Sequence, residues 1–60
     1  MNEIVEYIIF KEKEETIHVV GFIIDEDRTS LTISLTKSYG DYIDTKTIRL
    51  NDVLSRQKLL

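Results

Sequence analysis

One nine-residue stretch decides the fold: Thr16-Ile17-His18-Val19-Val20-Gly21-Phe22-Ile23-Ile24. Its β-branched and aromatic side chains favour an extended strand. The apolar side chains fall on both faces of that strand, with Val20, Phe22 and Ile24 on one face and Ile17, Val19 and Ile23 on the other. Gly21 lies in the middle, where a glycine marks a bend, a bulge or a close backbone approach. The stretch therefore predicts a long strand that bends at Gly21 and packs one face before the bend and the other face after it.

The segments on either side of this strand extend it into a sheet. Residues 4–10 are β-branched and aromatic, and the charged run 11–15 separates them from the stretch, so the two predict a hairpin. A helix over residues 4–10 is the alternative, because the apolar residues also fit an i, i+4 spacing. After the stretch, residues 25–30 have the composition of a turn. The next segment alternates strictly and predicts a strand, with Leu31, Ile33 and Leu35 inward and Thr32, Ser34 and Thr36 outward.

The last third of the chain predicts a loop and a strand, followed by a C-terminal segment with two alternative structures. Residues 37–42 form the loop, and residues 46–50 a strand with Ile48 and Leu50 inward and Arg49 outward. Ile43 is out of phase with that pair, which predicts a bulge or loop around residues 44–45. Asn51 and Asp52 can cap one helical turn. Residues 53–60 then form either a single 3₁₀ turn and a closing strand, which we favour, or a two-turn terminal helix.

Length and composition limit the class of protein. Sixty residues make one small domain, residues 1–60, whose core is near the lower size limit for folding alone. Oligomerisation is a common way to add buried area to such a chain. There is no cysteine, so we expect no disulfide and a reducing cytoplasmic environment. No run approaches the ~20 apolar residues of a membrane span, and residues 1–10 lack the basic leader of a signal peptide.

The spacing of apolar residues resembles that of a known superfamily. The residues that carry the resemblance are Val19-x-Gly21-x-Ile23-x-x-Glu26, Leu31-x-Ile33-x-Leu35 and Ile48-x-Leu50-x-x-Val53-x-x-x-x-x-Leu59. They resemble SH3-type small barrels, and within that group the Sm-like domains and the C-terminal barrel of ribosome-maturation factors. The resemblance implies a mainly β, SH3-like, five-stranded antiparallel barrel that binds RNA or protein. The alternative fold is a four-stranded antiparallel sheet with a short C-terminal helix.

One departure from the Sm-like pattern bears on function. Sm-like domains read nucleotides with a glycine followed by Asn or Asp near the fourth strand. The corresponding segment here, Arg49-Leu50-Asn51-Asp52, has no glycine. The departure argues against RNA binding in a ring of Sm type.

Charge is distributed unevenly along the chain. The net charge is −3. Residues 1–27 hold two basic and eight acidic side chains, a charge of −6, and residues 28–60 hold six basic and three acidic side chains, a charge of +3. The asymmetry predicts an acidic and a basic side. The alternative is that the two halves interleave in the fold and the asymmetry cancels.

The residues usually responsible for catalysis or metal binding are sparse. His18 is the only histidine and has no cysteine or nucleophile at a recognisable spacing. Asp25, Glu26 and Asp27 lack the spacing and glycine of a calcium loop, and read as a solvated turn. With only Gly21 and Gly40, no glycine-rich phosphate loop exists. We therefore expect no enzyme, no catalytic residue, no cofactor and no metal.

The best candidate binding surface combines loop tyrosines with basic residues. Exposed tyrosines beside cations can stack on bases or grip a peptide, although one tyrosine could instead cover the end of the core. If the fourth and fifth strands are neighbours, their basic side chains share a face, which could otherwise be an ordinary solvated surface. The candidate residues are Lys37, Tyr39, Tyr42, Lys46, Arg49, Arg56 and Lys58.

Two functions follow, from different classes. The first is a non-enzymatic protein-interaction module that can self-associate, of the kind common among bacterial and phage accessory proteins. The alternative is a small barrel that binds RNA or DNA, which requires the basic residues on one continuous face and a salt-sensitive affinity. We expect a protein partner, with a homo-oligomer or a nucleic acid as the other candidates, and no membrane.

Overall fold

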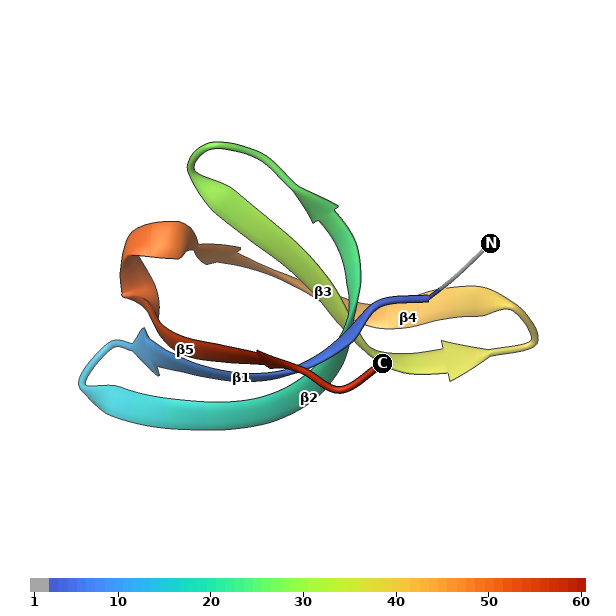
Figure 1. The fold of residues 1–60 in the computed structure, drawn as a ribbon, viewed down its shortest axis with the longest axis horizontal. Coiled ribbons are helices and arrows are strands. Elements are labelled where there is room, and N and C mark those ends of the chain that lie inside the picture. The colour runs from blue at the N-terminus through green and yellow to red at the C-terminus, as the bar shows by residue number, and fades with distance from the viewer. Residues whose placement is uncertain (1–2) are drawn as a thin grey trace.

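The structure, a computed structural model, describes residues 3–60, and this part of the chain is mainly β (Figure 1). The strands are β1 (Val5–Glu12), β2 (Glu15–Glu26), β3 (Ser30–Ser38), β4 (Asp41–Arg49) and β5 (Val53–Lys58), and a 3₁₀ turn, η1 (Leu50–Asp52), lies between β4 and β5. The β class and the favoured ending, a 3₁₀ turn and a closing strand, are confirmed. Helices over residues 4–10 and at the C-terminal end are wrong, because both segments pair as strands.

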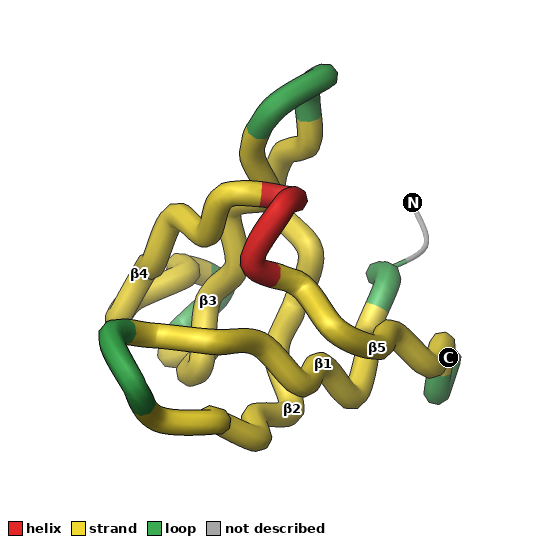
Figure 2. Tube along the Cα trace, turned by 90° about the vertical axis from the view of Figure 1, so that its left-hand side faces the viewer, coloured by secondary structure: helices red, strands yellow, loops and turns green. Residues whose placement is uncertain are grey.

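All five strands belong to one antiparallel sheet in the order β4-β3-β2-β1-β5. Figure 2 shows η1 carrying the chain from β4 across to β5. These two strands are the edges of the sheet and do not pair with each other over the described residues, so the sheet is open. Five antiparallel strands are therefore confirmed, whereas closure into a barrel is not.

β2 changes its pairing partner near Gly21. Its first part pairs with β1 up to Val5↔Phe22, and its last part pairs with β3 from Phe22↔Ser34 onward. Gly21 is buried, and a Cβ atom there would lie 3.2 Å from the backbone oxygen of Ser34 and 3.3 Å from Cδ1 of Ile33. The predicted close approach is confirmed, and the ribbon of β2 curves strongly (Figure 1).

The predicted exchange of packed faces along β2 is wrong. Ile17, Val19 and Ile23 all pack against the core from one face. On the opposite face Val20 is 53% exposed and Ile24 is also exposed. The strand curves around the core instead of crossing it, so the same face looks inward before and after Gly21.

The core is small and lies inside the curve of the sheet. Its buried members come from β1, β3 and β4, and are Ile8, Phe10, Leu31, Ile33 and Ile48. The inward positions of Leu31, Ile33 and Ile48 are confirmed, and Leu50 also packs against this cluster.

The expected alternation of β3 fails beyond Ile33. Leu35 is 44% exposed, and Ser34 is completely buried with its hydroxyl hydrogen-bonded to backbone carbonyls of Thr36 and Ile43. β2 crosses Ser34 at Gly21, whereas the end of the β3–β4 hairpin projects beyond the core (Figure 1). Leu35 therefore has no layer to pack against.

The β1–β2 and β3–β4 hairpins turn more tightly than the sequence predicts. Residues 13–14 reverse the chain between β1 and β2, with Lys13 at φ 56°, and residues 39–40 do so between β3 and β4, with Tyr39 at φ 51° and Gly40 at φ 82°. In the second turn both central residues have positive φ, the type I′ geometry that fits twisted strands. Most of the predicted connectors 11–15 and 37–42 are therefore strand.

The irregularity predicted around residues 44–45 takes another form. Asp44 has a left-handed φ of 55°. The pairing nevertheless passes from Thr36↔Ile43 to Ser34↔Thr45 with no change of register. No extra residue is inserted, so β4 is kinked rather than bulged.

Candidate interaction surfaces

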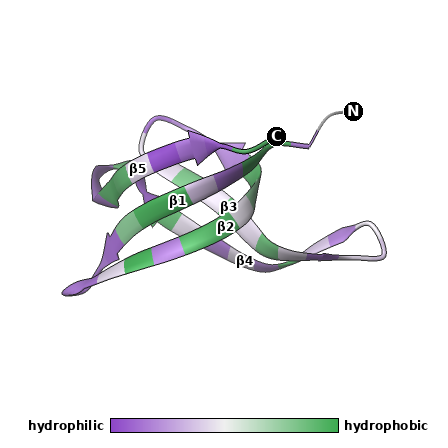
Figure 3. Cartoon of the chain, turned by 60° about the horizontal axis from the view of Figure 1, so that its bottom comes forward, coloured by the Kyte–Doolittle hydropathy of each residue, from purple (hydrophilic) through white to green (hydrophobic). Residues whose placement is uncertain are grey.

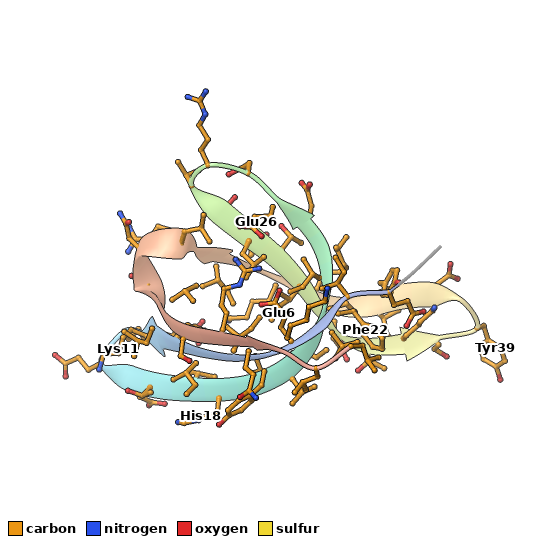
Figure 4. All side chains as sticks on the ribbon, viewed as in Figure 1. Glu6, Lys11, His18, Phe22, Glu26 and Tyr39 are labelled. Atoms are coloured by element: carbon orange, nitrogen blue, oxygen red, sulfur yellow. The ribbon has the colours of Figure 1, made fainter. Side chains whose placement is uncertain are left out.

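The loop residues of the predicted binding surface lie on the β3–β4 hairpin. Tyr39 is fully exposed at its tip (Figure 4). Tyr42 instead packs beside Phe22, with ring centres 5.5 Å apart, and the ammonium of Lys37 lies 5.3 Å from the centre of the Tyr42 ring. The structure thus brings Lys37 and Tyr42 together and separates Tyr39 from them.

The strand residues of that surface lie on two strands that are not neighbours. Lys46 and Arg49 belong to β4, and Arg56 and Lys58 to β5. These strands are the opposite edges of the sheet, so the condition for a common basic face is not met.

Several of these cations are held by carboxylates from the other half of the chain. Lys37 pairs with Glu3, and Lys46 pairs with Glu12. The hydrogen bond from Lys37 to Glu3 raises the pKa of the Lys37 ammonium. The acidic and basic halves therefore interleave, and the charge asymmetry of the sequence largely cancels, as the alternative expectation held.

Arg56 makes the most extensive of these contacts. Its Nε and Nη2 donate to the two oxygens of Glu6 at 2.7 and 3.0 Å, and Nη1 and Nη2 donate to the two oxygens of Glu26 at 3.0 Å each. Figure 4 shows Glu6 and Glu26 on the concave side of the sheet. Glu6 is only 8% exposed, so this ion pair is largely shielded from water. Hydrogen bonding to Arg56 lowers the pKa of Glu26, and the two carboxylates raise the pKa of Arg56.

This arrangement, the Arg56 clamp, ties β5 to β1 and β2. Both carboxylates meet the planar guanidinium through two hydrogen bonds, the geometry in which such pairs are strongest. Arg56 therefore stabilises the fold through these contacts, although the sequence suggested it as a binding residue. No local pattern in the sequence indicates this pairing, since 50 positions separate Glu6 from Arg56.

A cavity of about 330 Å³ lies where the end of β1 faces the end of β4. Phe10 and Ile48 contribute apolar lining, and Lys46 lies 5.9 Å from the centre of the Phe10 ring. Four cations and two carboxylates line it, so its net charge is opposite in sign to that of the whole chain. The charged lining residues are Lys11, Glu12, Lys13, Lys46, Arg49 and Asp52.

A second surface is the convex side of β1, β2 and β5, which we call the outer face (Figure 3). Its members are fixed by the strand register, because paired residues point to the same side of a sheet. Tyr7 pairs with Val20 and with Gln57, and Ile9 pairs with His18 and with Ser55. The ten positions of the outer face are Val5, Tyr7, Ile9, Lys11, Thr16, His18, Val20, Phe22, Ser55 and Gln57.

The outer face carries little charge, and its wholly apolar side chains are Val5, Ile9, Val20 and Phe22, of which Val20 is exposed and the others are half-buried. Lys11 is its one charged side chain, and the hydroxyl of Tyr7 is hydrogen-bonded to Nδ1 of His18 at 2.6 Å. The predicted binding surface includes none of these residues. Two signals in the sequence point to the face: apolar residues on both sides of residues 16–24, and the missing alternation in residues 4–10.

Fold and surfaces together define a small, mainly antiparallel β protein. No protein-family model, curated protein or solved structure matches the chain. Within residues 3–60, no cluster of three or more metal-ligating side chains is found. The same residues contain no helix of the length and apolarity required to cross a membrane.

Proposed function

We propose that the protein is a non-enzymatic protein-interaction module of the SH3-like small-barrel type, and that it binds its partner through the outer face. The strand order, with a 3₁₀ turn leading into β5 and β5 beside β1, supports the fold part of this proposal. The lack of cysteine supports a cytoplasmic location. By analogy with other short acidic chains, we place it among bacterial or phage accessory proteins.

One observation carries the proposed role: the outer face is depleted of charge. One of its ten side chains is charged, whereas 32% of all residues are. Depletion of charged residues and enrichment of aromatic ones mark the centre of protein–protein interfaces. Tyr7 and Phe22 supply the aromatic surface, and Val20 is more than half exposed at its middle.

The convex side of β3 and β4 is a useful contrast. It is also uncharged where Thr32 pairs with Thr47, but hydroxyls occupy it, and the two Oγ1 atoms lie 3.2 Å apart. Hydroxyls remain well hydrated, whereas exposed carbon gains free energy when a partner covers it. The exposed Val20 and the aromatic rings beside it, rather than mere lack of charge, distinguish the outer face.

Photo-crosslinking in the native cell tests the role. A photoreactive phenylalanine analogue at position 20 should yield covalent protein adducts, because a partner covers Val20. The same analogue at position 47, on the hydroxyl-lined side, is the matched control. Equal or absent adducts at the two positions would contradict an interaction through the outer face.

The cavity between β1 and β4 favours the second candidate function, nucleic-acid binding. Its four cations could contact phosphates, and Lys11 and Lys13 hold no ion pair among the described residues. The variant Lys13→Glu/Arg49→Glu should then abolish a mobility shift of short RNA or DNA at low salt, whereas Lys58→Glu should leave it. No shift for the unaltered chain at low salt would remove this candidate.

A further inference from the structure

We infer that the partner covering the outer face is a second copy of this chain, placed face to face as a two-fold dimer. The inference rests on the proposed role of the outer face and names its occupant. Two sheets packed in this way lie about 10 Å apart with their strands roughly aligned, as in a β-sandwich. Such a dimer would bury the outer face of each copy, with Val20 and the aromatic rings at its centre.

The position of the carboxylates favours a second copy. The chain has eleven acidic residues and a net charge of −3, so two copies repel each other over most approaches. None of the eleven belongs to the ten positions of the outer face. Two copies can therefore meet there without bringing carboxylates together.

The ends of β1 are complementary in charge. Lys11 lies on the outer face near one end of β1, and Glu3 is exposed just before the other end. A two-fold axis perpendicular to the strands and lying between the two sheets reverses the strand direction, so Lys11 of each copy comes close to Glu3 of the other. Within one chain the ammonium of Lys11 has only a long contact, 3.4 Å to Oγ1 of Thr16. Glu3 pairs with Lys37 of its own chain, so Lys11 of the other copy would join this pair as a second cation.

The size of the face predicts a weak dimer. A residue on one face of a sheet covers roughly 4.8 × 6.8 Å, so ten positions cover about 330 Å² of flat area per copy. The relief of side chains increases the accessible area, which brings the total for two copies to roughly 1,000 Å², at the lower end for specific interfaces. We therefore expect a dissociation constant on the order of 10 μM, rather than the nanomolar range.

Sedimentation equilibrium of the purified full chain tests this inference. Between ~1 and ~500 μM the mean mass should rise from 7.0 kDa toward twice that value. Val20→Glu and Val20→Lys should each weaken association at least about tenfold, since either charge would be buried without a partner. Thr47→Glu, which places the same charge on the hydroxyl-lined side, should leave it unchanged. Circular dichroism checks that each variant is folded.

Charge reversal tests the orientation. Lys11→Glu should weaken the dimer. The double variant Glu3→Lys/Lys11→Glu should associate more tightly than Glu3→Lys alone, which also removes the pair of Glu3 with Lys37. A chain that stays at 7.0 kDa throughout, or a dimer weakened equally by Thr47→Glu and Val20→Glu, overturns the inference. If the chain is monomeric but position 20 crosslinks to a different protein, the interaction role stands and the second copy is excluded. If the chain is monomeric and position 20 gives no adduct, both are overturned.

Discussion

Gly21 occupies the point where β2 leaves β1 and joins β3. Its missing side chain allows the backbone of β3 to approach, and Ser34 lies opposite with a buried hydroxyl. The sequence predicted the close approach because glycine weakens the interior of a strand unless a bend or a nearby backbone requires it. It did not predict that Ser34 is buried and Leu35 exposed, since those positions depend on where a distant strand crosses.

Replacing Gly21 by Ala should destabilise the protein by about 1–2 kcal/mol, because the new Cβ would press on the backbone oxygen of Ser34 at 3.2 Å. Urea unfolding of both proteins measures the change. Val20→Ala is the control, and at a concentration where the chain is monomeric it should change the free energy of unfolding by less than about 0.5 kcal/mol. An equally small effect at both positions would mean that the two strands do not approach as described.

At the scale of elements, the Arg56 clamp joins β5 to β1 and β2, which lie far from it in the sequence. The strand character of β1, β3 and β4 could be predicted, because β-branched composition and alternation are local properties. The partners of Arg56 could not, because pairing of β5 with β1 depends on the whole path of the chain. Because the sequence does not reveal which strands are neighbours, it suggested the basic residues of β4 and β5 as the binding surface, and the outer face emerged only from the structure.

Arg56→Met should destabilise the protein by about 2–4 kcal/mol, because it leaves the carboxylate of Glu6 shielded from water without a cation. For a domain of this size the loss is comparable to its whole stability. The double variant Glu6→Leu/Arg56→Met should recover most of it, since no shielded charge remains. Thermal unfolding followed by circular dichroism compares the three proteins. A double variant no more stable than Arg56→Met would contradict the clamp.

The whole molecule is held together in part by ion pairs between an acidic first half and a basic second half. The sequence predicted the opposite charges of the halves, and it left open whether they separate or mix. The structure mixes them, since Lys37, Lys46 and Arg56 each meet a carboxylate from residues 3–26. Stability should therefore depend on keeping the carboxylates ionised.

The pKa of Glu26 is lowered by its hydrogen bond to Arg56, and the pKa of Asp27 is lowered by the backbone amides of Thr29 and Ser30. A carboxyl with a lowered pKa in the folded state stabilises the fold above its ordinary pKa, and this contribution is lost as the pH falls through the lowered value. The free energy of unfolding in urea should thus decrease from about pH 4.5 downward. Asp27→Asn should show a smaller decrease. A constant free energy between about pH 5 and pH 3 would contradict this assignment.

The pairing of β5 with β1 also sets the order in which the fold is assembled. Each of the three hairpins closes over a turn of two or three residues, whereas Phe10 meets Val53 only after almost the entire chain has been placed. Long loops cost more entropy to close, so contacts of this kind form late and limit the folding rate. In the native state we expect the same strand to detach first, because its loss leaves all three hairpins paired. We therefore expect β5 to be the last strand to join the sheet during folding and the first to leave it during unfolding.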